Sequence, residues 1–193
     1  MIEYEISRAD MARVERKLNG LGKDAKKALK FAINDTAREA RHKLAEGVQD
    51  AYTAKIGHIQ SHMPIDWAKV SNLEATIRAN DRPLTLKSFS HRGGKSKPGG
   101  AAAAADIVKE GLKEIISQIN KNKAFKGPGG RIKGVIVQRD GKERSVLKVL
   151  HSNSVPKMIE KVYQGERGVN RAIKKTITEG LHRNIEAEIA KLT

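Results

Sequence analysis

Two long stretches of the chain repeat their apolar residues every three or four positions, which is the pattern of an amphipathic helix. The first covers residues 23–52, where small and aliphatic residues form one face and Lys, Arg and Glu the other. A helix of about 30 residues is about 45 Å long, so we expect it to be a spine with a sheet laid against it. The second covers residues 166–192. Its predicted apolar face consists of Val169, Ile173, Ile177, Leu181, Ile185 and Ile189.

Between these helices the apolar residues alternate with a period of two, which is typical of half-buried strands. Leu73, Ala75, Ile77 and Ala79 share one face, and alternation resumes at Leu84 after residues 80–83, Asn-Asp-Arg-Pro. We therefore predict a first hairpin over residues 73–89. A second is predicted from residues 132–138 and 143–150, because the Asp-Gly pair at 140–141 is a strong turn signal.

Shorter elements complete the prediction. They are a strand over residues 2–6, helices over 7–19 and 54–63, an irregular connector over 64–67, and a helix over 157–163 capped by the Ser-Val-Pro segment before it. Residues 90–100 and 124–131 are basic and rich in Gly and Pro, so we expect mobile loops that a partner would order. Residues 101–122 begin with alanines and favour a helix. Gly111 weakens that prediction and leaves a strand as the alternative.

Together these elements predict an α+β fold, with long N- and C-terminal helices packed on a small antiparallel sheet made of two hairpins. We expect one domain over residues 1–193. It consists of a helical region (7–63), a sheet region (73–151) with an inserted segment (101–122), and C-terminal helices (154–192).

The net charge of +16 indicates an acidic partner. Nucleic acid is the first candidate, an acidic protein surface the second and anionic lipid the third. Cysteine is absent, so the sequence has neither a disulfide framework nor thiolate metal ligands. We expect no membrane span and no secretory signal.

The search for reactive groups predicts no catalytic residue, no metal site and no cofactor. His58 and His62 would share one face of a helix, as in some zinc sites, but a third ligand at fixed spacing is missing and surface histidines are the simpler interpretation. Gly94-Lys95-Ser96 lacks the earlier glycine of a phosphate-binding loop. An enzyme, for instance a nuclease, would need clustered carboxylates, and the acidic residues are scattered.

Two sets of residues are candidate contact sites. The alanine-rich face of the first long helix is most simply core, with a seam between identical subunits as the alternative; its residues are Ala28, Ala32, Ala37 and Ala40. The basic segments could bind phosphate backbone or an acidic protein, and a solvated surface is the alternative for each residue taken singly. These candidates are His91, Arg92, Lys95, Lys97, Lys121, Lys123, Lys126, Arg131 and Lys133.

Four pieces of the sequence, in order, resemble the minor tail protein Z family of long-tailed phages and prophages, also called tail completion proteins. They are KKALKFAINDTAREARHKLAEGVQDAYTAKIGHI, LEATIRANDRPLTLKSF, the Ala124-Phe125 step with the GGRIKGVIVQRDGKERSVLKVL hairpin, and SNSVPKMI. Residues 101–122 depart from the family pattern, which runs a basic strand into the Ala-Phe step.

The resemblance implies a structural protein at the head-proximal end of the phage tail that promotes head–tail joining. Implied partners are the tail terminator and the head connector, with a ring of identical copies in the virion and a secondary contact to the DNA backbone. The implied location is the virion tail, and the host cytoplasm during assembly. A stand-alone, sequence-indifferent DNA-binding protein is the alternative.

Overall fold

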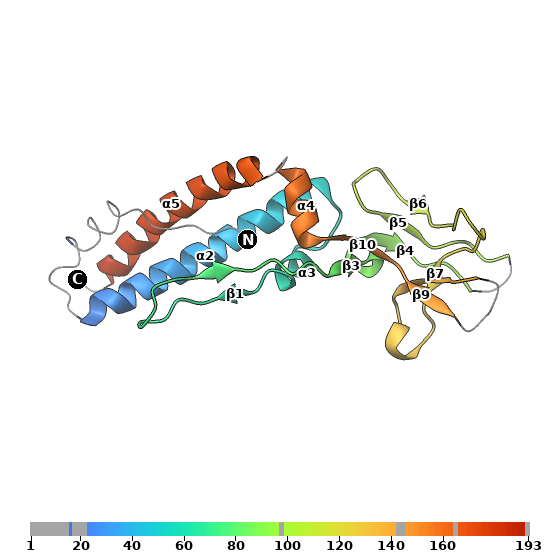
Figure 1. Ribbon diagram of the computed structural model, residues 1–193, viewed down its shortest axis with the longest axis horizontal. Coiled ribbons are helices and arrows are strands. Elements are labelled where there is room, and N and C mark those ends of the chain that lie inside the picture. The colour runs from blue at the N-terminus through green and yellow to red at the C-terminus, as the bar shows by residue number, and fades with distance from the viewer. Residues whose placement is uncertain (1–15, 17–22, 97–98, 142–145, 164–165, 192–193) are drawn as a thin grey trace.

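The computed structural model describes residue 16 and residues 23–96, 99–141, 146–163 and 166–191. The strand predicted over residues 2–6 and the helix over 7–19 lie outside these ranges, apart from Arg16, which is helical. The molecule is elongated, with the long helices at one end and most of the strands at the other (Figure 1).

Helices α2 (Lys23–Ala51) and α5 (Glu166–Ala190) confirm the two long helices predicted from periodicity. They lie side by side and antiparallel (Figure 1), because Leu29 and Ile33 pack with Leu181 and Ile185, whereas Leu44 near the other end of α2 packs with Ile173. Polar side chains also form contacts between α2 and α5. The Asn184 amide donates to Thr36 Oγ1 at 3.1 Å, and Arg183 pairs with Glu39.

The C-terminal end of α2 meets two short helices, α3 (Ile56–Ser61) and α4 (Val155–Val162), both in predicted helical regions. Their apolar residues form the main core with Val48, Leu84 and Phe89. Ser154 precedes α4 in the N-cap position, but its side chain does not cap the helix. Its hydroxyl instead donates to the Asp81 carboxylate and ties the start of α4 to the segment just before Pro83.

The predicted first hairpin is wrong, because its two arms pair with different strands. β2 (Thr76–Ile77) pairs antiparallel with β1 (Ile65–Asp66), in the segment predicted to be irregular, and this ribbon contacts α2. β3 (Pro83–Thr85) pairs antiparallel with β10 (His151–Ser154). The period-two pattern specified which side of each arm is buried, and long-range packing selected the partners.

Two three-stranded antiparallel sheets form the other end of the molecule. One contains β4 (Ser90–Arg92), β5 (Ala104–Asp106) and β6 (Lys113–Glu114), and the other β7 (Phe125–Lys126), β8 (Ile136–Arg139) and β9 (Leu147–Val149). Backbone hydrogen bonds from Ala103 to Ala124 (2.7 Å) and from Ala124 to Ile115 (2.9 Å) join them. A small core lies between the sheets and includes Leu86, Ala105 and Ile136. Short 3-10 helices, η1 (Leu86–Ser88) and η2 (Gly130–Ile132), complete this region, which we call the β-rich lobe (residues 86–150).

The helix favoured for residues 101–122 is wrong, and the strand alternative is confirmed by β5 and β6. Ala102 to Ala105 are buried, and a methyl group at neighbouring Gly94 would lie 2.3 Å from the backbone nitrogen of Ala103. At so close a backbone approach only very small side chains fit. Packing therefore overrides the helix propensity of alanine.

Other parts of the sheet prediction need smaller corrections. Ser90–Arg92 and Phe125–Lys126 form strands within segments predicted to be loops. The second hairpin is confirmed by β8 and β9, although its first arm, predicted over residues 132–138, begins as a strand at Ile136 and continues to Arg139. Arg139 pairs with Leu147 and the Asp140 amide donates to Val146 O at 3.1 Å, so the connection is longer than the predicted turn at residues 139–142.

The α+β class is confirmed, with small antiparallel sheets of two or three strands. The position of the sheets differs from the prediction. The β1–β2 ribbon lies along α2, and the two three-stranded sheets lie beyond the helices (Figure 1).

Candidate functional site

We examined the described residues for side chains that could bind a metal ion together. Within the described ranges, no three His, Asp or Glu side chains converge as metal ligands would. His58 and His62 lie on and just after α3, and His62 Nδ1 is 3.0 Å from the carbonyl oxygen of His58. The His62 ring is therefore turned toward the backbone of α3.

Positive charge is concentrated on the β-rich lobe. Residues 86–150 contain fifteen Lys or Arg against five Asp or Glu, so one third of the chain carries +10 of the net +16. Charge at this density attracts acidic surfaces over several ångströms and raises the rate of association with them.

The structure brings the predicted basic residues to this lobe, with Lys97 outside the described ranges. His91 and Arg92 belong to β4 and Lys126 to β7, whereas Arg131 is in η2. The remaining candidates flank these elements: Lys95, Lys121, Lys123 and Lys133.

Some of these residues already have partners in the lobe. Arg92 Nη2 lies 3.4 Å from Glu114 Oε1, Lys123 Nζ lies 3.4 Å from Gly100 O, and His91 Nδ1 lies 2.9 Å from Phe89 O. The other candidates are exposed and form no ion pair within the described part of the chain: Lys95, Lys121, Lys126, Arg131 and Lys133. These five are the side chains available to an acidic partner.

Some acidic side chains of the lobe also form ion pairs within it. Glu110 pairs with Lys113 across the β5–β6 turn. This hydrogen bond, together with the lysine charge, lowers the pKa of Glu110, and the same contact raises the pKa of Lys113. Both groups stay charged at neutral pH, so the pair adds nothing to the net charge of the lobe.

Sequence reasoning left out several basic residues of the lobe, and Lys148 and Arg139 are two of them. Lys148 is exposed between the half-buried Leu147 and Val149 of β9, and the alternation of this arm could have identified it. The Arg139 guanidinium lies 5.5 Å from the centre of the Phe125 ring, a cation–π contact that the sequence does not indicate.

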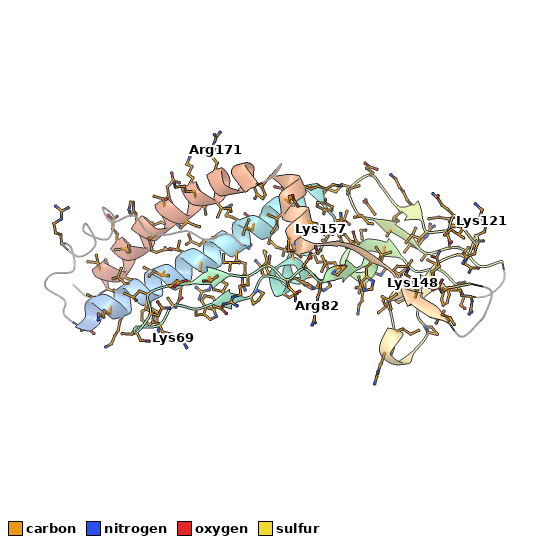
Figure 2. All side chains as sticks on the ribbon, viewed as in Figure 1. Lys69, Arg82, Lys121, Lys148, Lys157 and Arg171 are labelled. Atoms are coloured by element: carbon orange, nitrogen blue, oxygen red, sulfur yellow. The ribbon has the colours of Figure 1, made fainter. Side chains whose placement is uncertain are left out.

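Basic side chains also occur outside the lobe. Figure 2 shows Lys69, Arg82, Lys157 and Arg171 along the rest of the molecule, and Lys121 and Lys148 at the β-rich end. The lobe is thus the most basic part of a protein that carries positive charge throughout.

The alanines considered as a subunit seam are packed within the single chain. Ala28, Ala32, Ala37 and Ala40 are at most 9% exposed. Small side chains allow close approach of a neighbouring helix, and α5 lies along α2. Within one chain these alanines offer no free surface to a second subunit, and the subunit seam stays a prediction.

None of the described helices is long and apolar enough to cross a bilayer.

Comparison with known proteins identifies the family. Curated protein sequences and solved structures gave no match. The family model for prophage minor tail protein Z (GPZ) matches residues 11–193, and those residues include every element of the fold described above. The chain therefore belongs to the prophage minor tail protein Z family, a family of structural phage tail proteins.

Proposed function

We propose that the protein is a tail completion protein at the head-proximal end of the phage tail. There it promotes head–tail joining by docking to the tail terminator, the head connector or both. The observation that carries the proposal beyond the family assignment is the unpaired positive charge of the β-rich lobe. Long-range attraction accelerates docking onto an acidic surface. In a ring of copies on a ring of partners, modest single contacts add up to stable attachment.

We propose further that the whole chain acts as one domain in this role. Thr53, just after α2, donates its backbone N–H to Ile107 O at 3.0 Å, and Lys55 donates to Ser88 O at 3.0 Å. The Ile107 side chain packs against both the main core and the core of the lobe. We propose that the lobe is thereby held in a fixed orientation to the helices, so that one end of the molecule can be presented while the other is bound.

Contact with the DNA backbone is a second candidate, favoured by the same charge. The aromatic side chains of the lobe, Phe89 and Phe125, are both buried, whereas proteins that bind single strands stack bases on exposed rings. Binding to DNA would then depend on phosphate contacts alone. It would be indifferent to sequence and would weaken steeply with added salt.

The test is complementation of an inducible prophage that lacks this gene. We expect the deletion strain to accumulate tails and DNA-filled heads that remain separate, and the wild-type gene to restore plaques and joined particles. Reversing the charge of Lys121, Lys126 and Arg131 to Glu should prevent this rescue. The matched control makes the same charge change at exposed positions outside the lobe: Lys69, Lys157 and Arg171.

Two results would refute the proposal. One is normal yield of infectious particles from the deletion strain, and the other is absence of the protein from purified virions. Gel-shift titrations with duplex and single-stranded DNA between 50 and 200 mM salt examine the second candidate separately. If the charge-reversed protein loses DNA binding but still joins heads to tails, neither DNA contact nor the positive charge of the lobe is needed for joining, and the role proposed for that charge is refuted.

A further inference from the structure

Large apolar side chains are exposed along one edge of the β-rich lobe. Leu112 is 51% exposed, Ile116 is 41% exposed and Ile119 is 97% exposed. They lie along β6 and the turn that follows it, and we call these three residues the apolar edge. Ile116 forms a β-bridge with Lys123 two residues after Glu114 of β6, so alternation along the extended chain places these two side chains on the same side. The Arg92–Glu114 ion pair therefore lies on the side of Ile116, and its atoms are the polar part of that surface.

The turn that carries Ile119 is held in place by hydrogen bonds. Ser117 donates its N–H to Asn122 O at 2.9 Å, and the Asn122 side-chain amide donates to Arg139 O at 3.1 Å and to Gly141 O at 2.7 Å. Lys121 has a φ of 57°, which non-glycine residues rarely adopt. Anchoring of this kind fixes the turn before any partner binds, and a pre-ordered contact loses less entropy on binding.

The occupant of such an edge must match both its apolar and its charged character. A second copy of the chain would bring a lobe with the same charge of +10, and like charges oppose that contact. Nucleic acid would meet the lysines, but aliphatic side chains offer neither the flat ring for base stacking nor a donor for phosphate. An acidic protein surface with an apolar hollow satisfies both parts.

We infer that the apolar edge is a docking site for an acidic protein surface, with Ile119 inserted into an apolar hollow of that partner. Unpaired lysines of the lobe, Lys121 among them, steer the approach, and burial of the aliphatic side chains holds the complex. The inference rests on the proposed function, because the partner is then a protein of the tail or of the head. It adds the location of the contact and its chemistry, and it assigns a role to residues 101–122.

The experiment measures binding of purified protein to tails and to DNA-filled heads isolated from the deletion strain, by co-sedimentation at 0.1 and 0.5 M NaCl. Full burial of an Ile side chain corresponds to roughly tenfold to a hundredfold in affinity. We therefore expect Ile119→Ser to weaken binding by about that factor at both salt concentrations. Val70→Ser is the matched control, since Val70 is also large, apolar and 45% exposed but lies outside the lobe, in the connection between β1 and β2. It should bind within about twofold of wild type.

Each outcome bears on the inference separately from the proposed function. If wild type and Ile119→Ser bind the particles equally, the docking site is wrong and the joining function stands. If Ile119→Ser weakens binding to DNA rather than to the particles, the occupant is nucleic acid and the inference is overturned. If wild type binds neither particle, the proposed function fails and the inference fails with it. Far-UV circular dichroism and Tm of both variants should equal those of wild type, because the two side chains lie at the surface.

Discussion

Asn34 of α2 holds the β1–β2 ribbon against the helix, and its removal gives the sharpest test of the fold. The Ala68 N–H donates to Asn34 Oδ1 at 2.8 Å, and the Asn34 amide donates to Ala68 O at 3.2 Å. One side chain therefore satisfies both backbone groups of a residue that is only 3% exposed. The Ala68 side chain packs with Leu29 and Leu181 in the core between the long helices.

Substitution of Asn34 by Ala removes both hydrogen bonds and leaves the two Ala68 groups buried without partners. An unsatisfied buried donor or acceptor costs about 1–3 kcal/mol. Allowing for some entry of water, we expect a loss of about 2–4 kcal/mol in the free energy of unfolding. With a urea slope of about 2–3 kcal/mol per molar, the midpoint should fall by about 1 M.

The protein contains a suitable probe for this measurement. Trp67 is its single tryptophan, next to Ala68 in the chain, and the Arg38 guanidinium lies 5.5 Å from the ring centre. Tryptophan fluorescence in urea therefore reports detachment of the ribbon, and far-UV circular dichroism reports unfolding of the helices. In the Asn34→Ala variant the fluorescence transition should move to lower urea at least as far as the dichroism transition.

The matched control is Asn153→Ala, which removes an exposed amide that forms no side-chain hydrogen bond with the residues that the structure describes. It should change the free energy of unfolding by less than about 0.5 kcal/mol. If Asn34→Ala unfolded with the same midpoint as this control, the two hydrogen bonds would not be what holds the ribbon, and the reasoning would be refuted.

Four further predictions concern the short helices α3 and α4 and their contacts with α2 and with the chain before β3. A methyl group at Gly47 would lie 2.2 Å from Tyr163 Oη, so Gly47→Ala should lower stability by about 1 kcal/mol or more despite better helix propensity. Gly57→Ala in α3, with open space around it, should instead raise stability by up to about 1 kcal/mol, as urea titration of both would show. Ser154→Ala should cost about 1 kcal/mol by loss of its bond to Asp81, and equal stability of the two proteins would contradict that bond. Burial and nearby acidic groups raise the pKa of Tyr163, so its contribution to stability is present below pH about 10 and is lost as pH rises beyond that. Tyr163→Phe should therefore lose less stability than wild type between pH 9 and 11.

Some features of the fold follow from the sequence because their physical cause is local. The long helices were predictable since an apolar residue every three or four positions marks one helix face, and residues of that face, such as Ala32, Leu44 and Leu181, are indeed buried. The β8–β9 hairpin was predictable for the same reason, because its arms are neighbours in the chain and the turn residues lie between them.

The candidate site was predictable only in part. The number of basic residues is a property of the sequence, and so is their clustering in residues 86–150. Which of them form ion pairs cannot be read from the sequence. Arg92 meets Glu114 because of the register of β4, β5 and β6, and these strands are separated by connecting segments of the chain. The exposure of Ile119 was not predictable either, because the helix predicted over residues 101–122 would have placed this side chain on its apolar face.

What the sequence determined by itself is therefore the class of the fold, its long helices, its excess of positive charge and the family to which it belongs. Tertiary structure decided which strands pair, where the alanines of β5 lie, and which apolar side chains remain in solvent. The physical reason is that helix periodicity and charge are summed over neighbouring residues. A strand takes its hydrogen bonds, and a small side chain its place in the core, from segments far away in the chain.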